Sequence, residues 1–501
     1  MATLIDYLET QMRTFEQKPL NVIDSAIFTQ LALIDGEKIL PEQALHEKGQ
    51  VSEYSHEAEF RFYELLRAED FETMFRGLNP GKLKEILYRV AASPRFRNLV
   101  VRDFTSVLDE QKHIQFSATT YICPGCFSYV AFRGTDISIA GWQEDFELMC
   151  YQNVAAQRFA LEYLESVFPR LSGKIYVGGH SKGGNLALYA TLHASDEIQR
   201  KIERIYLHDS PGMKPGSVNP ARYNNIAHKI CRTIPQASVI GMLMDCPIPA
   251  QVVECKESAL AQHSVTNWQI RGDDFVYVDK VDESSVLLHK VSDKWMARFT
   301  DPELKMISDA LFAALKSAGV DDARLIFGGD MQLIELISLA HKNSDGPTLQ
   351  VLEEAIKELT DVIKEVAGNE ASEAWAQVMD GLERGKENRK TPEFKQALHK
   401  LIDVGAIPLN MFAKADFKEL DAESRDDKPH KVRVFVEDAN AGETDKKRRE
   451  SQRKQRKATT AEKRQEKAPH QAGAGQVVKN IAGNLGIQFD GSFTSGEQAL
   501  E

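Results

Sequence analysis

The sequence predicts an α/β fold in which a mostly parallel sheet carries helices on both faces. Strand-like apolar segments alternate with amphipathic helical segments between about residues 114 and 288, and such alternation is typical of parallel sheets covered on both sides. Within this region, residues 178–185 form a glycine-rich corner between one strand and one helix. Ligands of open α/β sheets bind at the carboxyl edge of the strands, so we expect the functional site there.

Helices are expected before the sheet. Residues 1–110 are predicted to be mainly helical and to form a lead-in or cap. In residues 56–75, for example, Phe60, Tyr63 and Leu66 lie on the apolar side of a predicted helix.

The sheet region itself gives clear signals for single elements. Strands are predicted at residues 127–132, 205–208 and 251–254, which are rich in β-branched and aromatic side chains. A helix is predicted over residues 155–168, with apolar side chains on one face and Pro169 at its end. These elements frame the glycine-rich corner.

The corner has the pattern Gly-x-Ser-x-Gly with Ser181 at its centre. The β-prone residues 174–177 precede it and the apolar helical residues 186–192 follow it. In this context the serine sits on a strained turn that exposes its hydroxyl, and Gly179 and Gly183 relieve crowding there because they lack a Cβ. The alternative is a turn that holds a phosphate, but the P-loop spacing is absent.

A nucleophilic serine needs donors for the oxyanion that forms on its substrate. The backbone N–H of Lys182 opens the following helix and is one predicted donor. Thr135 is the second, because it follows the predicted strand 127–132 directly after Gly134, which allows a sharp turn.

The serine also needs a base and an acid. His263 is the predicted base because it lies in a late loop, as expected for the order serine, acid, histidine. Asp209, at the end of the predicted strand 205–208, and Asp245 are both candidates for the acid. His180 is interpreted as a packing residue, since a neighbour in sequence points the wrong way to take the proton of Ser181.

Four motifs together resemble a known family. The motifs are AFRGTD at 131–136, GWQEDF at 141–146, GGHSKGGN at 178–185 and QHSVTNW at 262–268. They look like a bacterial family of lipase-like α/β-hydrolases catalogued as a domain of unknown function, over roughly residues 1–295. More distantly, FRGT and GHSKGG are similar to class-three, triacylglycerol-lipase-like enzymes.

The resemblance implies an α/β-hydrolase fold and roles for three residues. Ser181 matches the nucleophile, Thr135 the oxyanion residue and His263 the late histidine. The acid does not carry over: where such lipases place an aspartate, this chain reads ASVIG at residues 237–241. An aspartate at position 209 or 245 would complete the set of serine, histidine and acid.

Composition limits the compartment and the cofactors. The first 17 residues carry Asp6 and Glu9 and lack a continuous apolar run, and no stretch approaches the roughly 18 apolar residues of a membrane helix. We therefore expect a cytoplasmic protein without a secretory signal.

Cys123 and Cys126 form a C-x-x-C pair that could be redox-active or half of a zinc site, but the other four cysteines show no matching pair. A plain tight turn is the simpler interpretation, and no metal or organic cofactor is expected.

The C-terminal part is predicted to be helical and then disordered. Residues 1–300 would form the lipase-like domain, residues 301–422 a helical region that is a lid or a separate module, and residues 423–501 a charged tail. Residues 446–467 hold 11 Lys or Arg against 3 Asp or Glu, in a chain whose formal net charge is −12. This basic segment could bind nucleic acid or an anionic surface, although a solvated extension is the simpler interpretation.

Two functions from different classes follow. The first is an intracellular serine hydrolase of esterase, lipase or thioesterase type, acting on a small-molecule or lipid ester through Ser181, His263 and an acid. An acyltransferase would use the same residues with another acceptor in place of water. The second is a catalytically inactive hydrolase-like scaffold that binds a partner through its helical region and basic tail.

Overall fold

The computed structural model describes residues 2–40, 59–151, 153–257, 259–317, 319–320, 340, 343–383 and 391–403. Contacts divide the chain into two units, Met1–Arg425 and Asp426–Glu501. The predicted tail, residues 423–501, lies outside the described residues, and so does its basic segment. None of the helices that the structure describes has both the length and the apolar character to cross a membrane.

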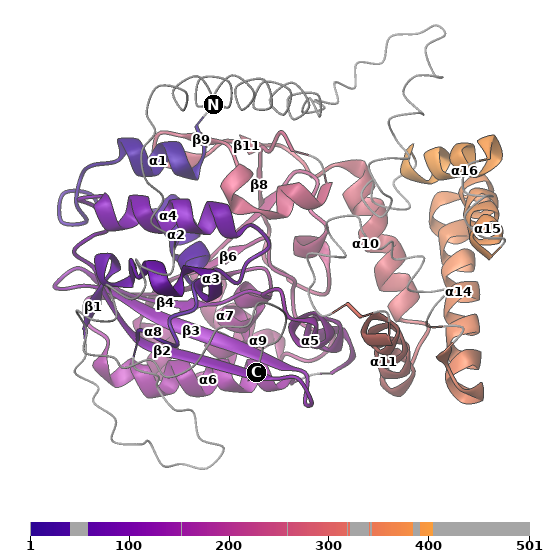
Figure 1. Ribbon diagram of the computed structural model, residues 1–501, viewed down its shortest axis with the longest axis horizontal. Coiled ribbons are helices and arrows are strands. Elements are labelled where there is room, and N and C mark those ends of the chain that lie inside the picture. Colours follow the sequence, from indigo (N-terminus) through magenta and orange to yellow (C-terminus); the bar gives the residue numbers. More distant parts are fainter. Residues whose placement is uncertain are drawn as a thin grey trace, which may run out of the picture. The chain divides into compact units, whose positions relative to one another are not determined.

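A nine-stranded sheet organises the first unit (Figure 1). Its strands, in spatial order, are β1 (Phe60–Arg61), β2 (Val100–Asp109), β3 (Ile114–Cys123), β4 (Phe127–Phe132), β5 (Lys174–His180), β6 (Ile202–His208), β7 (Ile230–Pro235), β8 (Gln251–Val253) and β11 (Tyr277–Val278). Strands β4 to β8 pair in parallel, whereas β1 to β4 and the pair β8 and β11 are antiparallel. A separate pair joins β9 (Ile270–Arg271) and β10 (Asp274–Phe275).

Helices cover both faces of this sheet because its buried strands alternate side chains between two cores. In β4, Tyr129 and Ala131 join one apolar cluster, while Val130 and Phe132 join another. The first cluster includes residues of α1 (Leu4–Thr10), α2 (Val22–Leu31) and α4 (Pro80–Ala92). The second includes residues of α6 (Ala155–Val167), α7 (Lys182–His193), α8 (Asp196–Lys201) and α9 (Pro220–Ile226). The prediction of a mixed α/β fold is confirmed.

Three expectations about secondary structure differ from the structure, two of them in part. The predicted lead-in, residues 1–110, is helical only in part. Strand β2 starts at Val100, is rich in β-branched residues and pairs with β3 along most of its length. In the described part of segment 56–75, the expected helix is replaced by β1, two short 3₁₀ turns and α3 (Phe71–Met74). Tyr63 is 58 % exposed there, while the neighbouring Phe62 is buried instead. The sheet is also parallel only in its centre, because the added strands on its flanks form antiparallel pairs.

Helices follow the sheet, as predicted for the described part of residues 301–422. They are α10 (Glu283–Met296), α11 (Asp301–Ser317), α14 (Gly346–Ala367), α15 (Asn369–Glu383) and α16 (Pro392–Asp403). Gly368 ends α14 with a φ of 90°, a backbone conformation that favours glycine. Helix α11 packs on α5 (Ile139–Cys150), and Gln143 donates to Asp309 over 3.1 Å.

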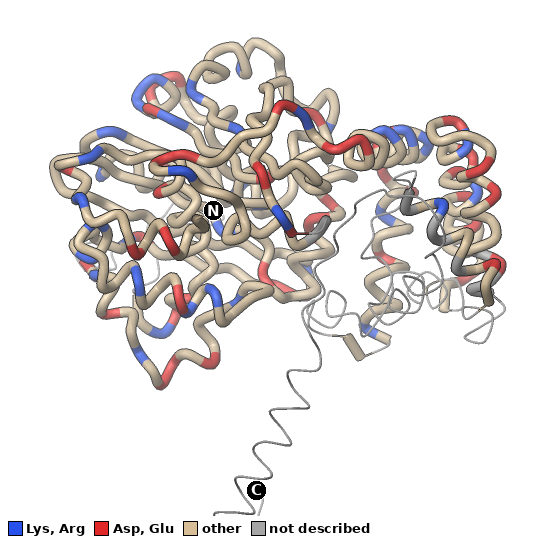
Figure 2. Tube along the Cα trace, turned by 90° about the horizontal axis from the view of Figure 1, so that it is seen from above, with Lys and Arg blue, Asp and Glu red and all other residues tan. Residues whose placement is uncertain are grey.

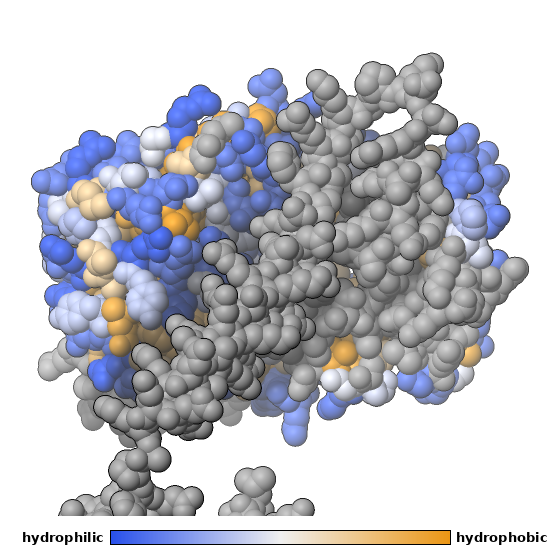
Figure 3. Space-filling model, turned by 45° about the horizontal axis from the view of Figure 1, so that its top comes forward, coloured by the Kyte–Doolittle hydropathy of each residue, from blue (hydrophilic) through white to orange (hydrophobic). Residues whose placement is uncertain are grey.

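The described surface is mixed in character. Acidic and basic residues are interspersed along the chain trace (Figure 2). In the space-filling view, apolar patches lie among mainly polar residues (Figure 3). The exposed large apolar side chains are Met12, Tyr63, Leu78, Tyr88 and Leu108.

A buried ion pair between Arg95 and Asp24 holds the N-terminal helices in place. The Arg95 guanidinium donates to both carboxylate oxygens of Asp24, over 2.8 and 2.5 Å, and both side chains are fully buried. Tyr7 donates to the same carboxylate over 3.0 Å. The Arg95 guanidinium also lies 3.9 Å from the centre of the Phe15 ring. This pair links α2 to the segment that leads into β2.

We expect Asp24→Ala to lower the free energy of unfolding by about 3–5 kcal/mol, because it leaves the Arg95 charge buried without a partner. Urea denaturation would measure the change. As a control, Glu9→Gln removes the more exposed ion pair with Arg89 (2.7 Å) and should cost no more than about 1 kcal/mol. Equal losses in the two variants would contradict the structural role of Asp24.

Candidate functional site

Ser181 occupies a strained corner between β5 and α7, in the predicted order of strand, turn and helix. Its φ is 57° and its ψ is −133°, a conformation that is rare for a residue with a side chain. The surrounding backbones are too close for larger residues. A Cβ on Gly179 would lie 2.0 Å from the carbonyl carbon of Gly183, and one on Gly183 would lie 2.2 Å from the oxygen of Phe132.

Asp209 lies beside this corner because it follows the neighbouring parallel strand, β6. The Ser181 N–H donates to the carbonyl of His208 over 3.0 Å, so the ends of β5 and β6 are joined at this point. The Asp209 N–H donates to Thr233 over 2.8 Å, which joins β6 to β7. Asp209 has a φ of 40°, a second strained residue at the same edge of the sheet.

His263 and Asp209 form a direct hydrogen bond. His263 Nδ1 lies 2.6 Å from Asp209 Oδ2, and the Asp209 side chain is buried whereas that of His263 is 19 % exposed. A neutral imidazole that donates from Nδ1 keeps Nε2 free to accept a proton. Asp245, the other predicted acid, is exposed and pairs through its backbone with Met213.

Two further donors hold the other oxygen of Asp209. Ser238 Oγ donates to Asp209 Oδ1 over 2.5 Å, and the Gly241 N–H donates to the same atom over 3.1 Å. A Cβ on Gly241 would lie 2.4 Å from this oxygen, so a larger residue would displace it. Ser238 and Gly241 belong to the ASVIG segment that lacks the expected acid. Nothing in their local sequence signalled this contact.

His180 connects the corner to the loop of His263. Its Nε2 donates to the His263 carbonyl over 2.7 Å, and the two rings lie 4.4 Å apart. Burial, and to a smaller extent the nearby His263, lower the pKa of His180 well below its usual value. A neutral His180 that donates from Nε2 agrees with the predicted packing role. This contact holds the loop of His263 against the residue that precedes Ser181.

Thr135 lies against the same corner, in the loop between β4 and α5. A Cβ on the preceding Gly134 would lie 2.8 Å from the His180 oxygen and 3.5 Å from Ser181 Cβ, so this loop touches the turn. Thr135 Oγ1 donates to Asp145 Oδ2 in a short hydrogen bond. Asp145 belongs to the GWQEDF motif, but sequence reasoning gave it no role.

Lys182 contributes differently through its backbone and its side chain. Its N–H begins α7, and the first N–H groups of a helix have no acceptor within the helix. Its ammonium is buried and donates to Glu144 over 3.0 Å and to the Gln115 carbonyl over 2.9 Å. Glu144 also accepts from the N–H groups of Gln115 and Ala156, each over 3.0 Å. The side chain therefore fixes the start of α7, and only the N–H can face a ligand.

Burial raises the pKa of Asp145 to about 6, although the nearby Lys182 and the hydrogen bond from Thr135 favour ionisation. Its Oδ1 atom is buried and has no hydrogen-bond partner among the described residues. A carboxyl whose pKa is higher in the folded chain than in the unfolded chain stabilises the fold at low pH. This stabilisation is lost as the pH rises from about 4 to about 6.

We therefore expect the free energy of unfolding of the wild type, relative to Asp145→Asn, to fall by about 2–3 kcal/mol between pH 4 and pH 7. Urea denaturation of both proteins at a series of pH values would measure it. Asp196→Asn is the control, since that carboxylate is 69 % exposed and should give a nearly flat difference. A flat difference for Asp145→Asn would contradict the raised pKa.

Comparison with known proteins identifies one similarity. A family model described as Mbeg1-like matches residues 90–313, slightly less than half of the 501-residue chain. The search of curated proteins gives no match. Thr135, Ser181, Asp209 and His263 all lie within the matched span, so the chain is similar to the Mbeg1-like family over the region that forms this site.

Proposed function

We propose that this protein is a serine hydrolase of carboxylic esters, with Ser181 as nucleophile, His263 as base and Asp209 as the acid that orients the base. The observation that carries the proposal is the 2.6 Å hydrogen bond between His263 and Asp209 at the corner where Ser181 is held at a φ of 57°. The match to the lipase-like Mbeg1-like family supports an ester as substrate and an α/β-hydrolase type of fold.

The reaction proceeds by acyl transfer to the serine. Ser181 Oγ attacks the ester carbonyl while Nε2 of His263 takes its proton, and Asp209 stabilises the imidazolium that forms. The N–H groups of Thr135 and Lys182 donate to the oxyanion. Collapse of this intermediate breaks the ester bond, and His263 gives its proton to the leaving alkoxide. Water then attacks the acyl-enzyme by the same steps and releases the acid.

Asp145 has a positioning role in this proposal. Its hydrogen bond to the Thr135 hydroxyl fixes the loop whose N–H binds the oxyanion. Lys182 and Glu144 fix the second donor in the same way, by locking the first turn of α7. Oxyanion donors are effective when they need no rearrangement as charge develops, which explains why buried groups hold both of them.

The absence of an aspartate from the ASVIG segment is the feature that favours the alternative, a catalytically inactive scaffold. Asp209 supplies a carboxylate to His263 from the adjacent strand, and Ser238 of ASVIG donates to that carboxylate. This carboxylate favours an active hydrolase over the inactive scaffold. An acyltransferase would use the same residues and would differ only in the acceptor that replaces water. The cytoplasmic location of the protein stays a prediction.

We expect a fluorophosphonate probe to label the wild-type chain covalently at one site. Ser181→Ala should abolish labelling, because the attacking oxygen is gone. Gel fluorescence and peptide mass spectrometry would measure it, with Ser264→Ala as the control serine from the His263 loop. A folded wild type that takes up no label, or label that persists in Ser181→Ala, would refute the proposal.

The choice of acid gives a second expected outcome. Asp209→Asn should lower kcat for a short-chain nitrophenyl ester by about 10⁴-fold, since the imidazole loses the partner that orients it. Asp245→Asn is the matched control and should leave kcat within about twofold, because Asp245 is exposed and Asp209 is the carboxylate that bonds His263. Loss of activity in Asp245→Asn but not in Asp209→Asn would reverse the assignment.

A further inference from the structure

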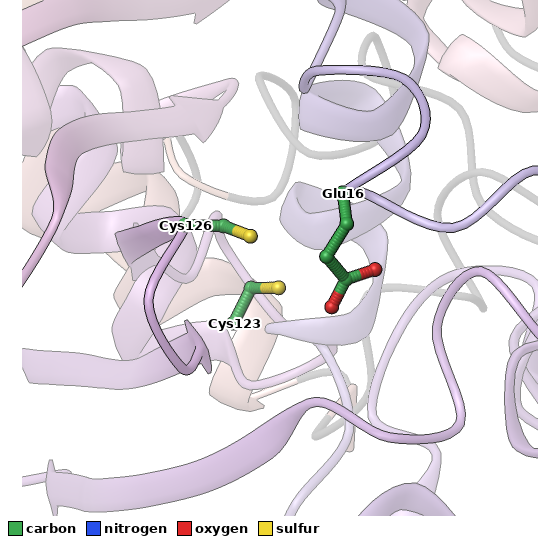
Figure 4. Close-up of side chains that lie close together, drawn as sticks. All are labelled: Glu16, Cys123 and Cys126. Carbon is green, nitrogen blue, oxygen red and sulfur yellow. The ribbon is translucent and has the colours of Figure 1, made fainter.

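The side chains of Glu16, Cys123 and Cys126 converge at a place that the proposed reaction does not use (Figure 4). One carboxylate oxygen and the two sulfur atoms all lie within 4.8 Å of one another. Cys123 and Cys126 are the C-x-x-C pair of the sequence, and both are free thiols. Glu16 comes from the segment between α1 and α2, so no sequence spacing connects it to the pair.

The two thiols are held by a tight hairpin between β3 and β4. The Cys126 N–H donates to the Cys123 carbonyl over 2.9 Å, and Gly125 provides the φ of 78° that this turn requires. The Cys126 carbonyl accepts from Lys174 at the start of β5 over 3.1 Å. A Cβ on Gly173 would lie 2.6 Å from that carbonyl oxygen. Both cysteines are therefore attached to the central sheet by their backbones.

Glu16 is fixed by its own neighbours. The Arg95 guanidinium donates to the carbonyls of Arg13 and Lys18, over 2.9 and 3.0 Å, on either side of Glu16. The adjacent Phe15 ring packs edge-on against Phe127, with the ring centres 4.9 Å apart. The carboxylate thus reaches the thiols from a segment that a buried cation and an aromatic contact hold in place.

We propose that Glu16, Cys123 and Cys126 bind one Zn²⁺ ion, with water as the fourth ligand. Zinc takes thiolate and carboxylate ligands in tetrahedral geometry. Metal–ligand bonds of about 2.0–2.3 Å then place the ligand atoms roughly 3.5–3.8 Å apart, so a small contraction of the observed cluster suffices. Binding displaces the two thiol protons to solvent. Glu16 is exposed and Cys126 half-buried, which leaves the open position accessible to water.

A second cluster shows what distinguishes this site. His113, Glu147 and Asp309 also lie close together, but the ammonium of Lys305 already binds Asp309 over 2.7 Å and lies 3.9 Å from Glu147. A cation there would meet a resident positive charge. Among the described residues, no ion pair involves Glu16. Its carboxylate accepts a hydrogen bond from the Thr14 side chain and keeps further lone pairs for a metal ion.

The proposed zinc site is independent of Ser181. It lies where β4 and β5 begin, whereas Ser181 follows the end of β5. The seven residues of β5 separate the two places by about 20 Å at roughly 3.3 Å per residue. The ion would therefore connect the N-terminal segment to the sheet and take no part in ester hydrolysis.

Titration of the chelator-treated, reduced full-length chain with Co²⁺ tests the proposal. We expect one equivalent to produce the visible bands of tetrahedral cobalt and a thiolate-to-cobalt charge-transfer band, and one equivalent of Zn²⁺ to displace it. Cys123→Ser and Cys126→Ser should each lose the charge-transfer intensity at one equivalent. Glu16→Gln should keep the charge-transfer band but weaken Zn²⁺ binding at least tenfold. Cys246→Ser, a half-buried cysteine elsewhere, is the control and should bind as the wild type does.

Stability and activity provide a second readout. Zn²⁺ should raise the melting temperature of the wild type and of Ser181→Ala, but not that of Cys126→Ser, and Cys126→Ser should still react with the fluorophosphonate. The absence of stoichiometric binding, or binding that survives loss of both thiols, would overturn the proposal. So would a chain that binds no Zn²⁺ when reduced and instead joins Cys123 to Cys126 when treated with a low-molecular-weight disulfide.

Discussion

The close approach of backbones around Ser181 is the constraint on which the rest of the site depends. The turn is held between α7 and the loop after β4, and glycines at 134, 179 and 183 make room for it. A turn of this kind costs free energy, because Ser181 adopts a conformation that side chains disfavour. The surrounding sheet and helices offset that cost and hold Ser181 next to the loop that carries Thr135.

Buried polar groups on the opposite face of the sheet support the same strands. Ser25 of α2 hydrogen-bonds to Tyr129 over 2.7 Å and to His208 over 2.9 Å, and His208 also contacts Thr233 over 2.8 Å. Burial lowers the pKa of His208 to about 3, so this ring is neutral and acts as a structural connector. His208 directly precedes Asp209, and its fixed position therefore helps to fix the Asp209 carboxylate.

Two buried ion pairs in the first unit are surrounded by further hydrogen bonds. Asp24 with Arg95 and Glu144 with Lys182 each combine opposite charges with backbone partners. Such pairs contribute little net stability compared with apolar packing, but losing one member is costly. They hold single segments in unique positions: the loop that carries Glu16 in one case and the first turn of α7 in the other. Both proposed sites rest on charges that do not themselves react.

The sequence by itself determined the mixed α/β fold, the strand, turn and helix order around Ser181, and the helical region after the sheet. These features follow from local periodicity and from glycines that only certain turns require. The choice between Asp209 and Asp245 depended on tertiary structure, since two turn aspartates look alike until strand order brings one beside His263. Asp145, Ser238 and Glu16 were found only in the structure for the same reason. Their roles come from contacts between segments far apart in the chain, and a single sequence carries no periodic signal for such contacts.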